Sequence, residues 1–311
     1  MARSSAFERA MAAIGPVPGG MGQLADRVLD KAEAVVVRHP DWPLVKVPDL
    51  LAAAYGIAGD RRDALVAGGV LLYAAADVID DAQDGDLAPE FWGDPPFKRA
   101  VNLGNAFLFA ALGAFLDAAP DAGTAGLVAW DFSQAGLKMA VGQHLDFDLG
   151  LAGPPMSENE YLDCVEGKSG ASLGLFCRLA GLCGDRPEAE WMRLESLGTA
   201  LGAAVQIRSD VAEVWSGQKN RDLGQRTLPI LFALALLPET EVLAMARDSS
   251  RQGELVELLD RAGAGGYCEL RIESYLRQAR ADLDALELAP AIRAELETVV
   301  DAIRDGGRAA L

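Results

Sequence analysis

The chain has 311 residues, of which 50% are hydrophobic and 6% aromatic, and its 46 acidic and 28 basic residues give a formal net charge of −18. An acidic surface repels phosphate backbones, which argues against nucleic acid as a partner. The four cysteines form no CxxC pair and only two histidines are present, so neither a disulfide framework nor a histidine-built zinc site is expected. The apolar runs are too short to span a bilayer and the N-terminus lacks a signal peptide, so we expect a cytoplasmic protein without a transmembrane segment.

Apolar residues recur at helical spacing along almost the whole chain, and no segment shows the period-two alternation of a strand. Clusters of Gly, Pro and Asp separate the helical segments. Helices are predicted at residues 21–38, 48–58, 62–84, 97–119, 123–149, 158–184, 187–214, 227–237, 240–262, 267–286 and 289–305. The sequence therefore predicts one all-α domain over residues 1–311 with long central helices, in which residues 1–20 form a poorly ordered or peripheral segment.

The stretch ADVIDDAQDGD, residues 76–86, places four carboxylates on one face at the end of the helix predicted at 62–84. Asp77, Asp81 and Asp84 follow the spacing i, i+4 and i+7, and Asp80 stands beside them. The alternative is a solvated acidic helix end, but the helix macrodipole disfavours anions at a C-terminus. A bound cation removes the repulsion, and carboxylate oxygens suit Mg²⁺. The stretch therefore predicts a magnesium site.

DDAQD, residues 80–84, matches the DDxxD motif of the trans-isoprenyl diphosphate synthases and their class I terpene synthase relatives. Further segments resemble the family's landmarks in the same order, over roughly residues 45–300: VNLGNAFLFAALGAF, GQHLDF, EGKSGASLGLFCRLAG, AVQIRSDVAEV and DLGQRTLPILFAL. The resemblance implies the all-α isoprenoid synthase helical bundle with a central active-site cavity. It also implies an enzyme that ionises an allylic prenyl diphosphate with the help of Mg²⁺, three ions in this family.

The resemblance assigns roles residue by residue. Metal ligands would come from the first acidic motif and from a degenerate second one: Asp80, Asp84, Asp81, Ser209, Asp210 and Glu213. The catalytic groups would be these three aspartates of the first motif with Lys168 and Gln206. Contacts to the substrate would come from Lys168, Ser169, Arg226, Lys219, Gln143 and Asp146, with Ala75 and Ala76 as the floor of the hydrocarbon pocket. The alternatives are a snorkelling or ion-paired Lys168 and helix-packing hydrogen bonds for Gln143 and Asp146.

Cationic residues that chain-elongating members use for isopentenyl diphosphate are missing. An arginine pair is expected shortly after DDxxD, where this chain has Pro89 and Glu90. The cations nearest in the sequence that could take their place in part are Arg38, His39, Lys98 and Arg99, and Lys46 stands out of register. The half of the site that ionises the donor is thus retained, while the half that binds the acceptor looks lost.

These observations favour a terpene synthase that acts on a C15–C20 or longer allylic diphosphate and releases a cyclised or eliminated hydrocarbon. The main alternative is a prenyltransferase, which either elongates with isopentenyl diphosphate or transfers to a different acceptor. A second alternative is a non-catalytic partner subunit of a prenyl synthase. The resemblance further implies a homodimer.

Overall fold

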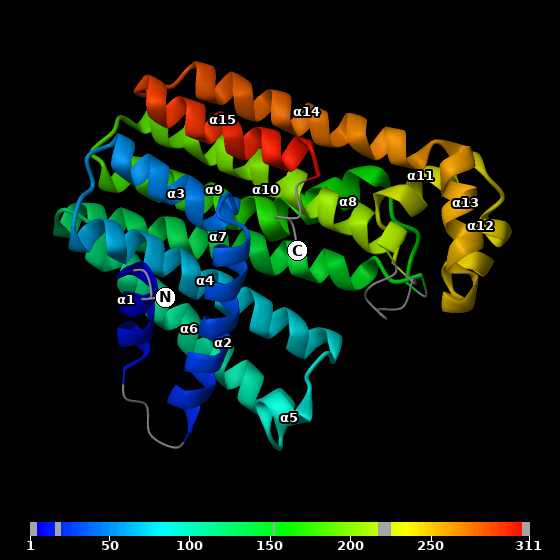
Figure 1. Ribbon diagram of the computed structural model, residues 1–311, viewed down its shortest axis with the longest axis horizontal. Helices are drawn as coiled ribbons and strands as arrows, with labels where there is room; N and C mark the ends of the chain where they lie inside the picture. Colours follow the sequence, from blue (N-terminus) through cyan, green and yellow to red (C-terminus); the bar gives the residue numbers. More distant parts are fainter. Residues whose placement is uncertain (1–4, 16–19, 152, 217–224, 307–311) are drawn as a thin grey trace. The chain divides into compact units, whose positions relative to one another are not determined.

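The computed structural model describes residues 5–15, 20–151, 153–216 and 225–306, and within these ranges it contains helices and no strand. Figure 1 shows the long helices that dominate the chain. The only pairing of strand type in the described ranges is an isolated bridge between Gly150 and Gln225. The predicted all-α fold is confirmed.

Two compact units make up the chain. Unit 1 consists of Met1–Ser133, Leu175–Glu195 and Glu287–Val299, and unit 2 of Gln134–Gly174, Ser196–Leu286 and Val300–Leu311. Four helices contribute residues to both units: α7 (Ala122–Asp148), α9 (Ala171–Cys183), α10 (Glu188–Ser216) and α15 (Pro290–Arg304).

Unit 1 contains six further helices, of which α4 and α6 form the centre. They are α1 (Ser5–Ile14), α2 (Met21–Arg38), α3 (Pro43–Ala54), α4 (Asp60–Asp84), α5 (Pro89–Trp92) and α6 (Pro96–Ala118). The backbones of α4 and α6 approach closely because Gly68 on α4 faces the Phe115 ring and Gly104 on α6 faces Ile79. At the start of α4, Arg61 donates hydrogen bonds to the carbonyls of Ala118 and Cys183. One guanidinium thus serves the last carbonyls of two helices, α6 and α9, where the macrodipole favours a cation.

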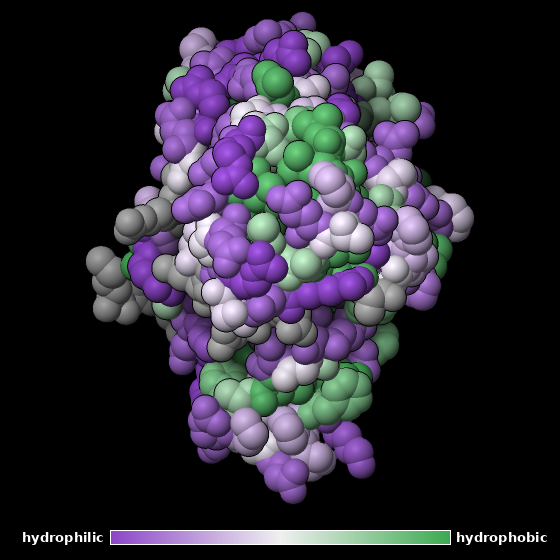
Figure 2. Space-filling model, turned by 90° about the vertical axis from the view of Figure 1, so that its right-hand side faces the viewer, coloured by the Kyte–Doolittle hydropathy of each residue, from purple (hydrophilic) through white to green (hydrophobic). Residues whose placement is uncertain are grey.

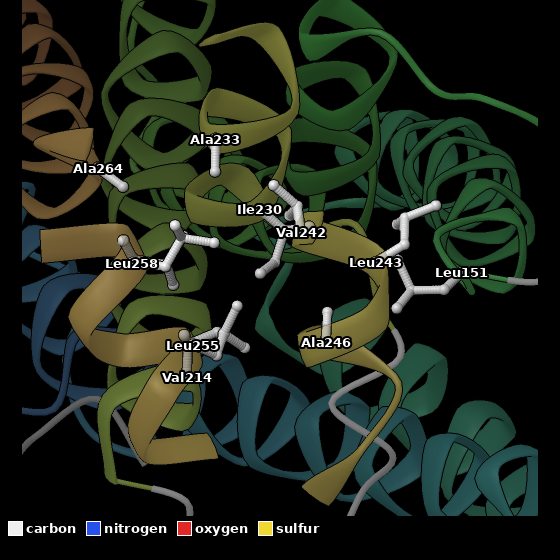
Figure 3. Packing of buried hydrophobic residues seen from close by; sticks show 11 residues of the cluster. Leu151, Val214, Ile230, Ala233, Val242, Leu243, Ala246, Leu255, Leu258 and Ala264 are labelled. Atoms are coloured by element: carbon white, nitrogen blue, oxygen red, sulfur yellow. The ribbon is translucent and has the colours of Figure 1, made fainter. Parts of the chain in front are cut away.

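Unit 2 contains the remaining helices and a second, smaller core. The helices are α8 (Glu158–Val165), the π-turn η1 (Glu166–Gly170), α11 (Leu228–Leu236), α12 (Glu239–Ala246), the 3₁₀ turn η2 (Ser249–Arg251), α13 (Gln252–Ala262) and α14 (Ala264–Asp284). Figure 3 shows buried aliphatic side chains of α11, α12 and α13 turned toward one another, among them Ile230, Val242 and Leu258. Leu151 and Val214 join this cluster.

Most predicted helices agree with the structure to within a few residues, and the differences have local causes. Residues 5–14 form helix α1, whose Phe7 and Ala10 are buried in unit 1, where a poorly ordered or peripheral segment was expected. The helix predicted at 240–262 is interrupted, because the Asp248 side chain accepts a hydrogen bond from the Ser250 backbone N–H and starts a new turn. Helix α3 begins earlier than predicted, with Pro43 in the first turn, where a missing N–H costs nothing.

Within the part of the chain that the structure describes, one helix, α6, is long and apolar enough to cross a membrane by length and composition. A core helix of a soluble protein passes the same test, and eight of the residues of α6 are buried in this structure. On the face drawn in Figure 2, hydrophilic residues cover most of the surface, and hydrophobic residues reach it in separate patches. The apolar composition of α6 is therefore weak evidence for a membrane span.

All four cysteines are free and buried. Burial raises the pKa of the Cys183 thiol to about 11 and that of Cys268 to about 12. Because the thiolate is the reactive form, these residues act as small apolar side chains at neutral pH.

Candidate active site

The first acidic motif occupies the last two turns of α4, in unit 1. Asp80 and Asp81 are half-buried, whereas Asp84 is exposed beside Gly85, which ends the helix in the left-handed conformation. One turn before the motif, burial raises the pKa of Tyr73 strongly, and the charges of Asp77, Asp81 and Asp80 raise it further. The carboxylates therefore create a strongly negative field on one face of the helix.

These carboxylates fit Mg²⁺ only when the ion is shared with a phosphate. No group of three or more His, Cys, Asp or Glu side chains is arranged to hold a metal among the described residues. Mg²⁺ commonly takes one or two carboxylates, keeps several waters and completes its octahedron with substrate phosphate oxygens. The donor set on α4 matches that pattern.

Lys168 and Ser169 lie in unit 2 on η1, a π-turn between α8 and α9. Glycines on both sides make room for this turn. A Cβ atom on Gly142 of α7 would lie 2.4 Å from the Lys168 backbone nitrogen, and one on Gly202 of α10 would lie 2.4 Å from the Ser169 carbonyl oxygen. The backbones of α7 and α10 thus contact η1 directly on two sides. Turns of the π type are frequent at functional sites.

A chain of hydrogen bonds connects η1 with α10 and α8. The Ser169 hydroxyl donates to Gln206 Oε1 (2.5 Å), and Gln206 Nε2 donates to Asp210 Oδ1 (2.9 Å). The Tyr161 hydroxyl donates to the other oxygen of Asp210 (2.6 Å). Beside this chain, Lys168 Nζ forms an ion pair with Asp146 Oδ2 (2.9 Å). Four side chains that the sequence assigned to one cavity, Ser169, Gln206, Asp146 and Lys168, are thus positioned by partners within unit 2.

Asp210 is turned into the interior of unit 2 and is 8% exposed. Burial raises the pKa of the Asp210 carboxyl to about 7, although the hydrogen bonds from Tyr161 and Gln206 act to lower it. Both of its oxygens already accept hydrogen bonds, while Ser209 and Glu213 on the same helix are half-buried. Ser209 and Glu213 are therefore the more exposed oxygen donors of the second acidic motif, and Asp210 as a metal ligand stays a prediction.

Tyr161 is the site residue that sequence reasoning missed. It is fully buried, and its only polar side-chain atom is the hydroxyl that holds Asp210. The available signal was a tyrosine within a buried helical segment, since a buried Tyr hydroxyl normally finds a polar partner.

Arg226 is buried and bound to backbone carbonyls. Its guanidinium donates to the carbonyls of Gly150 (2.6 Å) and Leu151 (3.2 Å), and Arg247 donates to the same carbonyl of Leu151. Both arginines thus hold the segment that follows α7, and contact of Arg226 with a diphosphate stays a prediction. Lys219 lies outside the described residues, and Gln143 is half-buried on α7.

Ala75 and Ala76 have different surroundings. Ala75 is fully buried where α4 meets α6, and its carbonyl oxygen lies 3.6 Å from the position of a Cβ on Gly104. Ala76 is exposed, on the same face as Asp80. Nearby, the Tyr73 ring packs edge-on against Trp42 with 4.5 Å between centroids. Ala76 is the more accessible of the two alanines, and a pocket floor formed by either residue stays a prediction.

Cations that could replace the missing arginine pair have local partners of their own. Lys46 forms an ion pair with Glu295 (2.7 Å), Arg38 donates to the carbonyl of Ala34, and Arg99 donates to the carbonyl of Asp94. A role of these three cations in binding an acceptor diphosphate stays a prediction.

The model of the polyprenyl synthetase family matches residues 75–260, which is more than half of the chain. The chain belongs to the polyprenyl synthetase family. It is therefore an enzyme, and the hypothesis of a non-catalytic subunit is set aside. The match includes the first acidic motif, η1 and the second acidic motif.

Two relatives from Mycobacterium tuberculosis match most of the chain. A geranylgeranyl diphosphate synthase is 29% identical over 256 residues, covering 75% of this chain and 72% of its own length. A nonaprenyl diphosphate synthase is 28% identical over 276 residues, covering 81% of this chain and 79% of its own length.

Solved structures agree in fold at lower identity. A polyprenyl synthetase from Streptomyces coelicolor has a TM-score of 0.78 at 19% identity, with 96% of each chain covered. A geranylgeranyl pyrophosphate synthetase from the archaeon Geoglobus acetivorans has a TM-score of 0.80 at 19% identity, covering 96% of this chain and 95% of its own. These likenesses identify the isoprenoid synthase fold that the sequence predicted.

Proposed function

We propose that the chain is a Mg²⁺-dependent prenyltransferase that extends an allylic diphosphate of C15–C20 or longer with isopentenyl diphosphate. The supporting observation is that the family match spans both acidic motifs and that the relatives matched over most of their length are prenyl diphosphate synthases. This reverses the order favoured by the sequence, in which a terpene synthase came first and the prenyltransferase was the alternative.

In the proposed reaction the C1–O bond of the allylic diphosphate breaks and diphosphate leaves. The allylic carbon then bonds to the alkene of the acceptor, which loses a proton. Asp80 and Asp84, with Asp81, would hold Mg²⁺, three ions by the family's pattern. When bound, the ions would supply positive charge to stabilise the leaving diphosphate. Asp80 and Asp81 are half-buried, so their field is weakly screened by water.

Residues of unit 2 would position and solvate the reacting carbon. Ser169 and Gln206 present oxygen dipoles that stabilise an allylic cation, and their mutual hydrogen bond fixes the direction of those dipoles. Lys168 would contact the diphosphate, and Asp146 holds its ammonium group in place until the anion arrives. Asp210 would orient Gln206 through a hydrogen bond, and Tyr161 would in turn hold Asp210 in place.

The terpene synthase remains the second candidate on one observation: Pro89 and Glu90 stand on α5 at the place of the expected arginine pair. A cyclising enzyme needs no second diphosphate site. Transfer to an acceptor other than isopentenyl diphosphate follows from the same observation.

Incubation of the purified chain with Mg²⁺ and an allylic diphosphate tests these candidates. Geranyl, farnesyl and geranylgeranyl diphosphates are each supplied with and without isopentenyl diphosphate, while released diphosphate and prenyl products are both measured. Longer diphosphates formed only with isopentenyl diphosphate support the proposal. A cyclic or eliminated hydrocarbon formed without it would overturn the proposal in favour of a terpene synthase.

We also propose that the chain forms a homodimer. Large apolar side chains are exposed on α6 and on the first part of α7, within unit 1: Phe109 is 77% exposed, Trp130 64% and Leu127 46%. Exposed large apolar side chains on consecutive helices are typical of a subunit interface. Light scattering on the eluted protein measures the mass, and a monomer at micromolar concentration would contradict the proposal.

We place the enzyme in the cytoplasm. The support is that eight residues of α6, among them Phe107 and Phe115, are buried in unit 1 and are thus not available to lipid. Fractionation of expressing cells checks this: recovery of the chain in the membrane pellet after a salt wash would contradict it.

A further inference from the structure

Two cations of α2 lie over one aromatic ring of α5. The Arg27 guanidinium carbon is 4.1 Å from the centroid of the Phe91 ring, and Lys31 Nζ is 4.6 Å from the same centroid. Arg27 Nη1 also donates to the Phe91 carbonyl oxygen (2.9 Å). All three residues belong to unit 1, and α2 packs against α4, the helix of the first acidic motif.

The ring that carries these cations is itself fixed. Phe91 packs edge-on against Trp92, with 5.3 Å between centroids, and Trp92 is 6% exposed. The short helix α5 begins with Pro89 in its first turn and ends at Gly93, which has a φ of 69°. The cations therefore rest on a rigid support, which reduces the entropy lost when a ligand binds.

Placing two cations together costs free energy unless an anion compensates. Like charges at i and i+4 on a helix repel, and a cation–π contact at an exposed site returns only about 0.5–1 kcal/mol. Elsewhere in the described residues arginines such as Arg62 and Arg178 are held by aspartates. Arg27 and Lys31 are positioned by a ring and a carbonyl. Two cations on one ring are thus a local concentration of positive charge within a chain whose net charge is −18.

The chemistry of the two side chains suits a diphosphate. A guanidinium stacked on a ring keeps its N–H groups in its own plane, from which it binds two phosphate oxygens at once, and an ammonium adds a point charge. Asp26, Asp30 and Glu90 stand next to these residues along the chain, so a ligand must carry more than one negative charge to compete with single carboxylates.

The position of Phe91 connects this site to the first acidic motif. Phe91 follows Asp84 by seven residues, a stretch of chain that spans at most about 25 Å. Part of that stretch is already folded back, because Gly85 is left-handed and the Asp86 N–H donates to the Asp81 carbonyl. The site is thus close in the chain to the expected position of the donor diphosphate, but separate from its ligands.

We propose that Arg27 and Lys31, held over Phe91, bind the diphosphate group of the acceptor substrate. This rests on the proposed function, since only an enzyme that elongates with isopentenyl diphosphate needs a second diphosphate site. Cations from α2 then replace the arginine pair that the sequence lacks after DDxxD. These cations lie on a helix about sixty residues earlier in the chain, since Lys31 and Phe91 are 60 positions apart.

Steady-state kinetics of the full-length chain with Mg²⁺ test this proposal. In one series the concentration of isopentenyl diphosphate is varied at a saturating concentration of the allylic diphosphate. In a second series the allylic diphosphate is varied at saturating isopentenyl diphosphate. For Arg27→Ala and Lys31→Ala we expect the KM for isopentenyl diphosphate to rise roughly tenfold or more, as for loss of one charge-assisted contact. The KM for the allylic diphosphate should change less than twofold. Phe91→Leu, which removes the ring but no charge, should raise the same KM. Arg277→Ala, an exposed arginine on α14, is the control for loss of one positive charge.

A second measurement tests the anion site independently of the proposed function. Calorimetry with inorganic diphosphate in the absence of Mg²⁺ should show binding that is weakened by the double variant Arg27→Ala/Lys31→Ala and unchanged by Arg277→Ala. If no allylic diphosphate is elongated but this difference is found, the proposed function fails while the anion site stands. Equal diphosphate binding in both variants, or a parallel rise of both KM values, would overturn the site itself.

Discussion

Replacement of Gly202 by alanine gives the sharpest test of how η1 is positioned. The new Cβ would lie 2.4 Å from the Ser169 carbonyl oxygen, whereas ordinary contacts begin at 3.4 Å, so one backbone must move by about 1.0 Å (3.4 − 2.4). Overpacking of this kind costs about 1–3 kcal/mol, against a gain of up to ~1 kcal/mol in helix propensity. The net loss is therefore up to about 2 kcal/mol, which lowers the Tm of a chain of this size by up to ~3 °C. The displacement also strains the hydrogen bond from Ser169 to Gln206.

Gly136→Ala is the matched control. Gly136 lies on α7 in the same unit, and a Cβ added to it would have no atom of the described residues within 4 Å beyond its own helix backbone and chain neighbours. Alanine there should raise stability by about 0.5–1 kcal/mol, because only the propensity gain applies. Thermal unfolding followed by far-UV circular dichroism compares the two variants. A Gly202→Ala protein as stable as Gly136→Ala would refute the backbone contact as the reason for glycine.

Four further predictions concern the site. Asp80→Ala should lower turnover by orders of magnitude and leave the circular dichroism spectrum helical, since the residue would hold metal and not the fold. Ser209→Asp adds a carboxylate to the second motif and should tighten binding of Mg²⁺ with inorganic diphosphate about tenfold in calorimetry. The raised pKa of Asp210, about 7 against 3.8, means that the folded state keeps a proton that the unfolded state has lost. Relative to Asp210→Asn, the wild type should therefore lose up to ~1.4 kcal/mol of stability per pH unit between about pH 4 and 7 in urea unfolding. Ala76→Phe should shorten the product in a chain-length assay, whereas Ala75→Phe should destabilise the protein by about 1–3 kcal/mol because that side chain is already buried.

Each of these has a contradicting result. Unchanged turnover in Asp80→Ala would remove the metal assignment, and an unchanged dissociation constant in Ser209→Asp would mean that the second motif does not face the diphosphate. Parallel pH profiles of wild type and Asp210→Asn would show that the carboxyl titrates near its ordinary pKa. Products of unchanged length from Ala76→Phe would place the end of the hydrocarbon pocket elsewhere.

The helices could be predicted from the sequence because each buries one face and therefore repeats its apolar residues at helical spacing. Helix α2 has the predicted bounds, Met21–Arg38, and α4 ends at Asp84 as predicted. The break between α12 and α13 could not be predicted in the same way. It depends on a single side chain, Asp248, that hydrogen-bonds to a nearby backbone N–H inside an otherwise regular apolar pattern.

Partners in the site were harder to predict than its residues. The sequence assigned Lys168, Ser169 and Asp146 to substrate contacts and Gln206 to the catalytic groups. The structure brings Lys168 to Asp146, and Ser169 to Gln206, within hydrogen-bonding distance. The sequence contained no sign that Asp210 would be buried, because that depends on Tyr161, which lies on another helix. Contacts between residues far apart in the sequence leave no periodic pattern. For the same reason, the convergence of Arg27 and Lys31 on Phe91 was not predicted.

The second core of unit 2 has a consequence for the order in which the protein opens. Because α11, α12 and α13 bury Ile230, Val242 and Leu258 against one another, they can separate from the rest of unit 2 as one cooperative group. Their amide protons should then exchange with deuterated solvent together, ahead of those at the centre of α4 and α6. The Arg226 N–H, bonded to the Leu149 carbonyl, joins this group to the end of α7 and would report its opening directly.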